Sequence, residues 1–451
     1  MFDTVFTTIG SSTRNIRIRN KNDQKIRISS ITLQNGEGSS FFLNVDGTPG
    51  RSFSDIEIAA NDSIYVFIQV KVDPQNSNSP LIISDVMNCT VNGKVQSIPL
   101  EAWGQDAYYH YSTNAIQFKD GSFLPYSLIS STKNVDTVWK KNKPHVIYGY
   151  LVVDSAQKLT IEAGVRVYLN YKAGLWVYRY GQLRVLGKKG DEVIFQGARR
   201  EKEYSDEPGQ WDRIWINEGS DNNLIDYAII KNGYIGVQAE LFDPKSFLGP
   251  GTLTIRNTVI QNMSMWGLYG LAYKINGGNN IISNCQEHSV NLMYGGVYNF
   301  YHCTFANFWR KSTPREKATV KINNYTDAQV LDHSFYFGNC IIDGRLGNEI
   351  QIDLKAEGNI AHTYTFSSSW LKTTENTDDP KHYLNVTKGT QLSYGHSDNY
   401  NFHIKATELQ VQGFKDAKAI ADAIKYPMDL KGVPRRTTVA TGVTAGAYEV
   451  E

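Results

Sequence analysis

The sequence predicts an all-β protein in which an immunoglobulin-like β-sandwich is followed by a parallel β-helix and a C-terminal cap. Three features lead to this prediction: short alternating strands near the start, a strand-like phrase that recurs through the middle, and very few long amphipathic helical patterns. A chain of 451 residues is too long for one ordinary core, so at least two domains are expected. The predicted domains are 1–105 for the sandwich, 106–403 for the β-helix and 404–451 for the cap segment.

The first hundred residues contain runs that are typical of short β-strands. The predicted strands are 15–19, 26–33, 41–45, 55–58, 64–72 and 97–100. Turn pairs such as Asn35-Gly36 and Asn92-Gly93 separate them. Apolar and polar residues alternate in Ile16 to Arg19 and in Ile64 to Ile68, which indicates strands with one buried face. Six or seven such strands predict a sandwich.

A repeated phrase in the middle of the chain predicts the coils of a solenoid. When its copies are aligned, one position is held by small residues: Ala228, Thr258, Cys285, Cys303, Cys340 and Ser369. Two residues later the aligned position is mostly apolar: Ile230, Ile260, Glu287, Phe305, Ile342 and Leu371. Because strand-like units at irregular intervals are typical of stacked coils with loops of variable length, we expect a parallel β-helix here.

The first coils show this pattern most clearly. The residues expected to point inward are Leu159, Ile161, Val165, Val167, Leu169, Leu175, Val177, Leu183 and Val185. The expected corners carry glycine, at Gly164, Gly174, Gly181 and Gly187, where tight turning is required. Insertions are expected at 199–210, 241–251, 309–319 and 373–382, gathered on one side of the solenoid. A short amphipathic helix is predicted over 414–424.

Composition argues against several classes of function. Lys+Arg 46 against Asp+Glu 45 gives a net charge of +1, so nothing in the charge favours a nucleic-acid partner. The sequence has no apolar run long enough for a transmembrane segment, and its first residues lack the pattern of an export signal. The four cysteines show no zinc-binding spacing and are interpreted as small buried hydrophobic residues.

Several phrases resemble a known family. The stretches HVIYGYLVVDSAQKLTIEAGVRVYLNYKAGLWVYRYGQLRVLG and GQWDRIWINEGSDNNLIDYAIIKNGYIGVQAE look like those of the secreted or surface right-handed parallel β-helix proteins of gut Bacteroidetes. FGNCIIDGRLGNEIQID and the final phrase with Asp429, Gly432, Arg435 and Gly446 also fit. The order of phrases in residues 1–104 resembles the ASH-type immunoglobulin-like modules. The resemblance implies a pectin-lyase-like fold and descent from cell-surface lipoproteins.

Aromatic residues are the main candidates for a binding surface. Trp176, Tyr178 and Tyr180 alternate with apolar neighbours, so their rings are expected to face outward, and Trp211 and Trp215 follow one or two coils later. Exposed aromatic rings offer flat apolar faces to sugars. The five residues are therefore predicted glycan-binding residues. The alternative interpretation is that these rings stack as a ladder or are covered by loops.

A polysaccharide lyase is the alternative function, since this reaction needs a basic residue and a cation to neutralise a uronate carboxylate. The candidates are the basic residues Arg310, Lys311, Arg315 and Lys317. Asp343, Glu349 and Asp353 are the candidate calcium ligands. The competing interpretation is a solvated insertion and an ordinary charged outer face. No cofactor is expected apart from this calcium.

The sequence thus favours a non-catalytic, extracytoplasmic surface protein that binds a polysaccharide or a host or cell-surface macromolecule along the β-helix. It is expected to be a cell-surface lipoprotein or a secreted protein, with its export signal absent from this chain.

Overall fold

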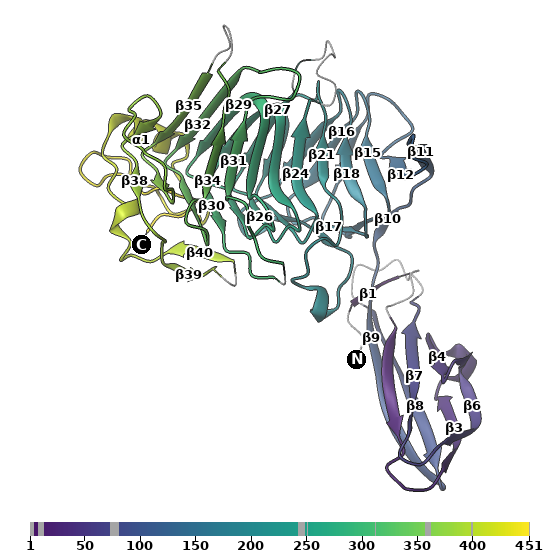
Figure 1. The fold of residues 1–451 in the computed structure, drawn as a ribbon. Coiled ribbons are helices and arrows are strands. Elements are labelled where there is room, and N and C mark those ends of the chain that lie inside the picture. Colours follow the sequence, from purple (N-terminus) through teal and green to yellow (C-terminus); the bar gives the residue numbers. More distant parts are fainter. Residues whose placement is uncertain are drawn as a thin grey trace. The chain divides into compact units, whose positions relative to one another are not determined.

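The computed structural model describes residues 4–7, 13–72, 81–241, 249, 251–311, 313–356, 362–397 and 400–450. These residues are nearly all β, with one α-helix among them. The chain divides into two compact units, one made of residues 1–108 with 200–205 and the other of 109–199 with 206–451 (Figure 1). None of the helices in the described part of the chain has the length and hydrophobicity needed to cross a lipid bilayer.

The first unit consists of two sheets. One sheet has the order β1-β9-β8-β3-β6, and its strands are β1 (Thr4–Phe6), β9 (Lys94–Gln105), β8 (Leu81–Val91), β3 (Ile26–Leu33) and β6 (Ser52–Ile58). The other has the order β2-β7-β4-β5, and its strands are β2 (Arg14–Arg19), β7 (Ser63–Val70), β4 (Phe41–Val45) and β5 (Thr48–Gly50). All pairings are antiparallel except that of β1 with β9.

The core of the first unit comes from both sheets. It includes Ile28, Phe41, Val66 and Leu100, each of which is buried. The predicted alternation is confirmed, because every second residue of β7 is buried. The sequence analysis missed β8, which pairs with β9 along its whole length. The resemblance to ASH-type modules begins in a phrase whose residues 8–12 lie outside the described residues.

The second unit is a stack of parallel strands in two large sheets. Most coils add two strands to an 18-stranded sheet and one strand to an 11-stranded sheet, whereas the coils of β27 and β29 add one long strand each to the larger sheet. We call the rows of strands the first, second and third faces, in the order in which the chain visits them. The first face holds β12 (Phe123–Leu128), β15 (Tyr150–Val153), β18 (Gly174–Val177), β21 (Ile214–Ile216), β24 (Ile235–Glu240), the starts of β27 (Trp266–Gly278) and β29 (Val290–Tyr301), β31 (Val320–Asn323) and β34 (Ile350–Asp353).

The second and third faces continue the same stack. The second face holds β13 (Asp136–Trp139), β16 (Lys158–Glu162), β19 (Gln182–Leu186), β22 (Asn223–Asp226), β25 (Thr252–Arg256), the ends of β27 and β29, β32 (His333–Gly338), β35 (His362–Ser367) and β37 (Tyr383–Leu384). The third face holds β10 (Tyr108–His110), β14 (His145–Ile147), β17 (Arg166–Leu169), β20 (Val193–Gly197), β23 (Ala228–Lys231), β26 (Val259–Gln261), β28 (Ile281–Ser283), β30 (Thr304–Asn307), β33 (Ile341–Gly344), β36 (Trp370–Leu371) and β38 (Thr387–Lys388). The antiparallel strand β11 (Asn114–Gln117) precedes β12.

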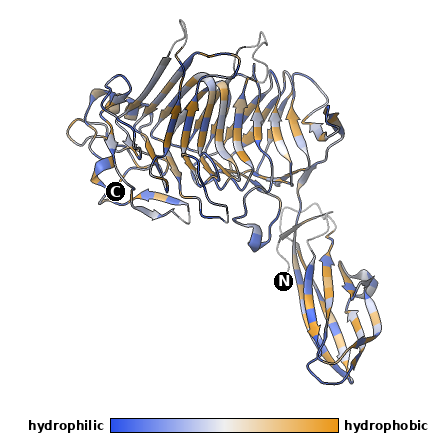
Figure 2. Cartoon of the chain, in the orientation of Figure 1, coloured by the Kyte–Doolittle hydropathy of each residue, from blue (hydrophilic) through white to orange (hydrophobic). Residues whose placement is uncertain are grey.

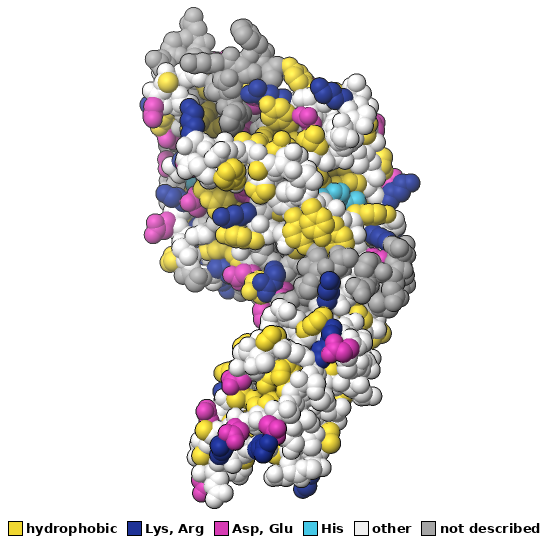
Figure 3. Space-filling model, turned by 90° about the vertical axis from the view of Figure 1, so that its right-hand side faces the viewer, with side chains coloured by type: hydrophobic (Ala, Val, Ile, Leu, Met, Phe, Trp, Pro, Cys, Tyr) yellow, Lys and Arg dark blue, Asp and Glu magenta, His cyan; other side chains and the backbone are white. Residues whose placement is uncertain are grey.

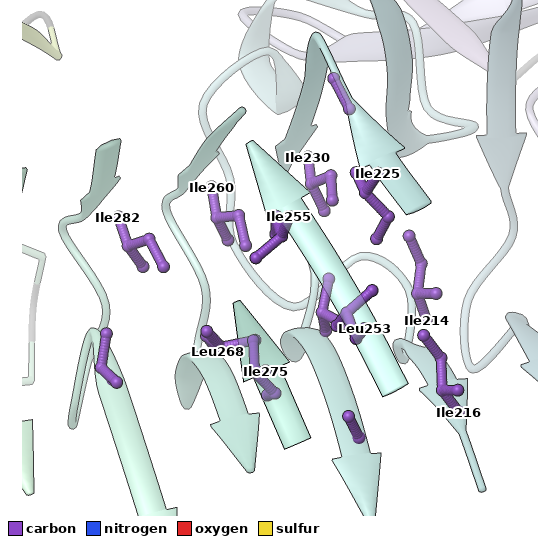
Figure 4. Packing of buried hydrophobic residues seen from close by; sticks show 14 of the residues in the cluster. Ile214, Ile216, Ile225, Ile230, Leu253, Ile255, Ile260, Leu268, Ile275 and Ile282 are labelled. Atoms are coloured by element: carbon purple, nitrogen blue, oxygen red, sulfur yellow. The ribbon is translucent and has the colours of Figure 1, made fainter. Parts of the chain in front are cut away.

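Columns of aliphatic side chains fill the interior of the stack. Ile230, Ile260 and Ile282 are register neighbours on the third face and are fully buried (Figure 4). All nine inward positions predicted for the first coils are also fully buried. Figure 2 shows hydrophobic residues recurring along the stacked strands. Because each coil covers the apolar side of the next, the stack is stable where one coil alone would not be.

The predicted alignment of the repeated phrase is wrong in one copy. Thr258 is followed in the stack by Asn280 and then Cys303, whereas Cys285 lies beyond the end of β28. Likewise Ile282, and not Glu287, occupies the apolar position. The Asn280 side chain serves in place of a small residue because it accepts from the Thr258 backbone N–H (3.1 Å) and donates to the Ile255 carbonyl (2.8 Å).

The C-terminal segment covers a side of the stack. The helix α1 (Ala417–Lys425) is capped at its N-terminus by Asp416, whose side chain accepts from the Ala419 N–H. Hydrophobic residues between 392 and 450 pack on the outer side of the third face against Ile281, Ile341 and Trp370, which belong to different coils. The segment therefore covers the side of several coils, whereas a cap at the end of the solenoid would contact the last coil alone. The remaining short elements are β39 (Tyr394–His396), β40 (Asn401–Ile404) and the 3-10 turns Gly36–Gly38, Lys202–Tyr204 and Leu409–Val411.

Candidate functional site

One outward-facing column runs along the first face and combines aromatic with hydrogen-bonding side chains. The strand register places in this column, which we call the polar-aromatic column, Trp176, Trp215, Gln238, Tyr269, Asn291, Lys321 and Gln351. Successive members come from successive coils, which lie about 4.8 Å apart in a parallel sheet. The column is therefore parallel to the axis of the solenoid. Gln238 and Asn291 are buried (6% and 4% exposed), so the accessible side chains of the column are the three aromatic rings, Lys321 and Gln351.

The two tryptophans of the column form a stacked pair. Their ring centroids are 4.7 Å apart and the rings are inclined by 14°. The Trp176 Nε1 donates to Asn217 Oδ1 (2.6 Å), and the Trp215 Nε1 donates to Glu240 Oε1 (2.5 Å). One face of each ring is therefore occupied by the other ring, and both rings are half-buried. The ladder of stacked rings, the alternative interpretation of the sequence, describes this pair better than two freely exposed platforms.

The tyrosines predicted for the site lie at its border. Tyr178 contacts Trp176 edge to face, with centroids 5.5 Å apart, and is half-exposed. Tyr150, which the sequence analysis did not select, is buried and contacts both tryptophans edge to face. Tyr180 is 55% exposed, but it lies in the turn after β18 with a φ of 60°. Tyr180 therefore does not belong to the column.

The expectation that Trp211 faces outward is wrong. The Trp211 side chain is 1% exposed, and its Nε1 donates to the Lys231 carbonyl (2.9 Å). Gly233 makes room for the ring, since a Cβ there would lie 2.8 Å from Trp211 Cε2. Trp211 precedes β21, which begins at Ile214, so the alternation that places Trp215 outward does not extend to it.

Two buried carboxylates lie beside the tryptophan pair, and the sequence analysis missed both. Glu240 accepts from Trp215 and from Gln238, and burial raises its pKa, with the negative charge of Glu218 adding to the shift. Glu218 is fully buried and accepts from Arg179 Nε (2.7 Å). The alternation of polar and small residues in β24 was the signal that could have revealed Gln238 and Glu240 as outward-facing.

A second polar group joins neighbouring coils on the same face. The Tyr150 hydroxyl donates to Asp212, and burial together with this carboxylate raises the pKa of the phenol. Arg213 Nε donates to Asp212 Oδ1 (2.9 Å), while its Nη1 donates to Gln238. The arginines beside the tryptophan pair are thus both held by carboxylates, Arg213 by Asp212 and Arg179 by Glu218.

The four candidate lyase residues do not form one site. Arg315 is buried and binds both oxygens of Glu349, at 2.6 and 2.8 Å. Lys311 pairs with Asp206 (2.9 Å), and Arg310 and Lys311 line a small hollow of about 160 Å³ with Tyr400. Lys317 is exposed.

The three candidate calcium ligands do not converge either. Asp343 accepts from the Tyr394 hydroxyl (2.9 Å), and burial raises its pKa to about 6. Glu349 is held by Arg315, and Asp353 accepts from the Tyr325 hydroxyl (2.9 Å). Within the described residues, no group of three or more His, Cys, Asp or Glu side chains is arranged to hold a metal ion. The donor set therefore does not fit calcium.

Comparisons with known proteins add little to this geometry. No family model matches the chain, and no curated protein matches it. A family 123 glycoside hydrolase from Clostridium perfringens shares 13% identity over 31% of this chain, with a TM-score of 0.17; the chain spans 26% of that protein. The catalytic unit of a thermostable GH87 alpha-1,3-glucanase from Streptomyces thermodiastaticus shares 9% identity over 84% of this chain and 89% of its own, with a TM-score of 0.31. These similarities are too low to support a functional argument.

Proposed function

We propose that this protein binds a polysaccharide along the polar-aromatic column and does not cleave it. The observation that carries the proposal is the column itself, in which the half-buried rings of Trp176, Trp215 and Tyr269 share one line with half-buried Lys321 and exposed Gln351. Aromatic surface and polar side chains along one axis suit a ligand that presents CH groups and hydroxyls repeatedly. Trp176 and Tyr178 contribute the part of each ring that remains exposed.

The charges beside the tryptophan pair favour a neutral polysaccharide. Lys321, the cation of the column, lies four coils beyond the second of these tryptophans. Arg179 and Arg213 are each paired with a carboxylate, so neither offers an unpaired cation to a uronate beside the tryptophan pair. Uronate β-elimination needs such a cation, which makes the lyase alternative the weaker one. Glycoside hydrolysis needs two carboxylates that reach the substrate, whereas Glu218 and Glu240 are buried and hydrogen-bonded within the protein.

In the same proposal the stack is a right-handed, pectin-lyase-like β-helix, and residues 1–105 are an immunoglobulin-like module of the ASH type that serves as a spacer or protein contact. The site of action is extracytoplasmic, either on a cell surface as a lipoprotein or in the secreted state. The resemblance of the quoted phrases supports this part of the proposal.

Affinity electrophoresis against a panel of neutral glucans, xylan, mannan and polygalacturonate tests the proposal. We expect retardation by at least one neutral polymer, with no release of reducing ends or of unsaturated product. Trp215→Ala should weaken binding about two- to tenfold, since one aromatic contact contributes ~0.5–1.5 kcal/mol. The matched control is Phe123→Ala, which removes an exposed aromatic ring (62%) outside the column. Equal weakening by both variants, or release of product, would contradict the proposal.

A further inference from the structure

The first face ends one coil earlier than the other two faces. In the last coil the third face has β38 and the second face has β37, which pair with β36 and β35. Between β36 and β37 the chain forms a loop, 373–382, where a strand of the first face would otherwise lie. Among the described residues, β34 pairs with β31 and with no strand on its other side.

The hydrogen bonds of earlier coils show which backbone groups of β34 lack the partner that a further strand would supply. Inward-facing residues at the start of each strand donate their N–H to the next coil: Leu175 to the Arg213 carbonyl, Val290 to the Thr319 carbonyl and Val320 to the Glu349 carbonyl, each at 3.0 Å. The equivalent N–H in β34 belongs to Ile350, and its acceptor is the side chain of its neighbour Asn348 (3.3 Å).

The geometry of the strand shows that the backbone groups of Ile352 also point to the side where the next coil would lie. Both backbone groups of one residue point to the same side of a parallel strand, and successive residues alternate. Because the Glu349 carbonyl points toward β31, so do the groups of Gln351, whereas the Ile350 carbonyl and both groups of Ile352 point away from it. An edge of this kind is a template for another strand.

A groove of about 570 Å³ borders this edge. Its lining includes Ile350, Gln351 and Ile352 of β34, and Tyr364 and Tyr383 supply aromatic surface. The charged residues of the lining are all acidic: Glu316, Glu375 and Asp379, each of them exposed. The groove thus combines backbone groups that no strand among the described residues pairs, apolar surface and negative charge.

We infer that the groove binds an extended polypeptide segment, which adds a strand to β34 and carries basic side chains at alternate positions. Its backbone pairs with Ile350 and Ile352, as in β-augmentation. One set of side chains lies on the aromatic surface, and the alternate set meets Glu316, Glu375 and Asp379. Of the residues of the polar-aromatic column, the groove lining includes Gln351, while the tryptophan pair and Tyr269 lie outside it, so the inference does not depend on the proposed function.

The test uses the full chain and an acetylated, amidated hexapeptide in which lysine and valine alternate, with binding measured by calorimetry. Ile352→Pro removes one edge N–H and leaves the bonds to β31 intact, because proline is tolerated where the N–H of an edge strand faces solvent. We expect saturable binding to the unaltered chain and at least a tenfold loss in Ile352→Pro.

Two further comparisons keep the inference testable if Ile352→Pro does not fold. We expect different affinities for two further hexapeptides, one N-methylated at the amides of its valines and the other at the amides of its lysines, because only one set of amides faces the edge. The Glu375→Gln, Asp379→Asn double variant should weaken the lysine peptide at least threefold and leave a serine-valine peptide unchanged. Three results would each overturn the inference. They are no binding to the unaltered chain, equal binding by both methylated peptides, and a sedimentation measurement showing that a second copy of the chain occupies the edge.

Discussion

The buried ion pair between Arg315 and Glu349 gives the sharpest test, because its two interpretations predict different outcomes. Arg315 was a candidate lyase base, yet its side chain is 2% exposed and that of Glu349 is 0% exposed. Arg315 also donates to the Asn307 carbonyl (2.8 Å), which fastens the insertion 309–319 to the coil. We therefore expect Arg315 to act in stability and not in chemistry.

Arg315→Met removes the cation and leaves the Glu349 carboxylate buried without its partner. Breaking a buried pair in this way costs ~3–5 kcal/mol. The matched control is Lys311→Met, which breaks the partly exposed pair with Asp206 and should cost no more than ~1 kcal/mol. Adding Glu349→Gln to Arg315→Met should recover part of the loss, because the neutral amide retains an acceptor for the Thr319 N–H.

The free energy of unfolding is measured by urea titration followed through tryptophan fluorescence. The reasoning is refuted if Arg315→Met costs less than ~1 kcal/mol, or if the double variant is the least stable of the set. A folded Arg315→Met protein that loses a uronate-lyase activity shown by the unaltered chain would restore the catalytic interpretation.

Three further predictions concern the same unit. Burial lowers the pKa of four histidines, to about 4 for His110, about 3 for His145 and about 4 for His288, and well below its ordinary value for His302. Between these values and the ordinary pKa near 6.5, the unfolded chain binds more protons than the folded chain. The free energy of unfolding should therefore fall as the pH drops from 6.5 toward 4, by up to ~1.4 kcal/mol per pH unit for each histidine. A urea midpoint that stays constant across this range would contradict the prediction. Gly174→Ala should destabilise the protein by ~1–3 kcal/mol, because a Cβ there would lie 2.5 Å from Tyr150 Cε1 and 2.8 Å from the Arg213 carbonyl oxygen; the exposed Gly190→Ala is the comparison, in which strain comes from its positive φ alone. Phe305→Ala should cost ~3–5 kcal/mol by opening a cavity among fully buried neighbours, and a cost below that of Phe123→Ala would be inconsistent with the packing.

The surface of the second unit agrees with the near-zero net charge. Figure 3 shows Lys and Arg side chains interspersed with Asp and Glu, with hydrophobic side chains between them. The exposed hydrophobic residues of this unit include Phe118, Phe123 and Val138, near the start of the stack. This distribution gives no electrostatic reason to expect a nucleic-acid partner.

The inward positions of the first coils follow from the sequence, because alternation within a strand is a local property. Leu175 and Val177 point inward and Trp176 outward whatever the neighbouring coils contain. The same reasoning fails at corners, and Trp211 shows why. Three residues outside a strand are enough to lose the alternation, and the space beside Gly233 decides where the ring goes.

Tertiary structure alone decides which coils are neighbours and what each side chain meets. Cys285 resembles the small residues of the repeat, yet Asn280 occupies that position, because insertions of variable length hide the register. Arg315 and Glu349 are far apart in the sequence, so nothing local reveals their pairing. Among the described residues one edge of β34 has no partner strand, because a loop replaces one strand in the last coil. Hydrogen bonds between coils are the property that a linear sequence leaves undetermined.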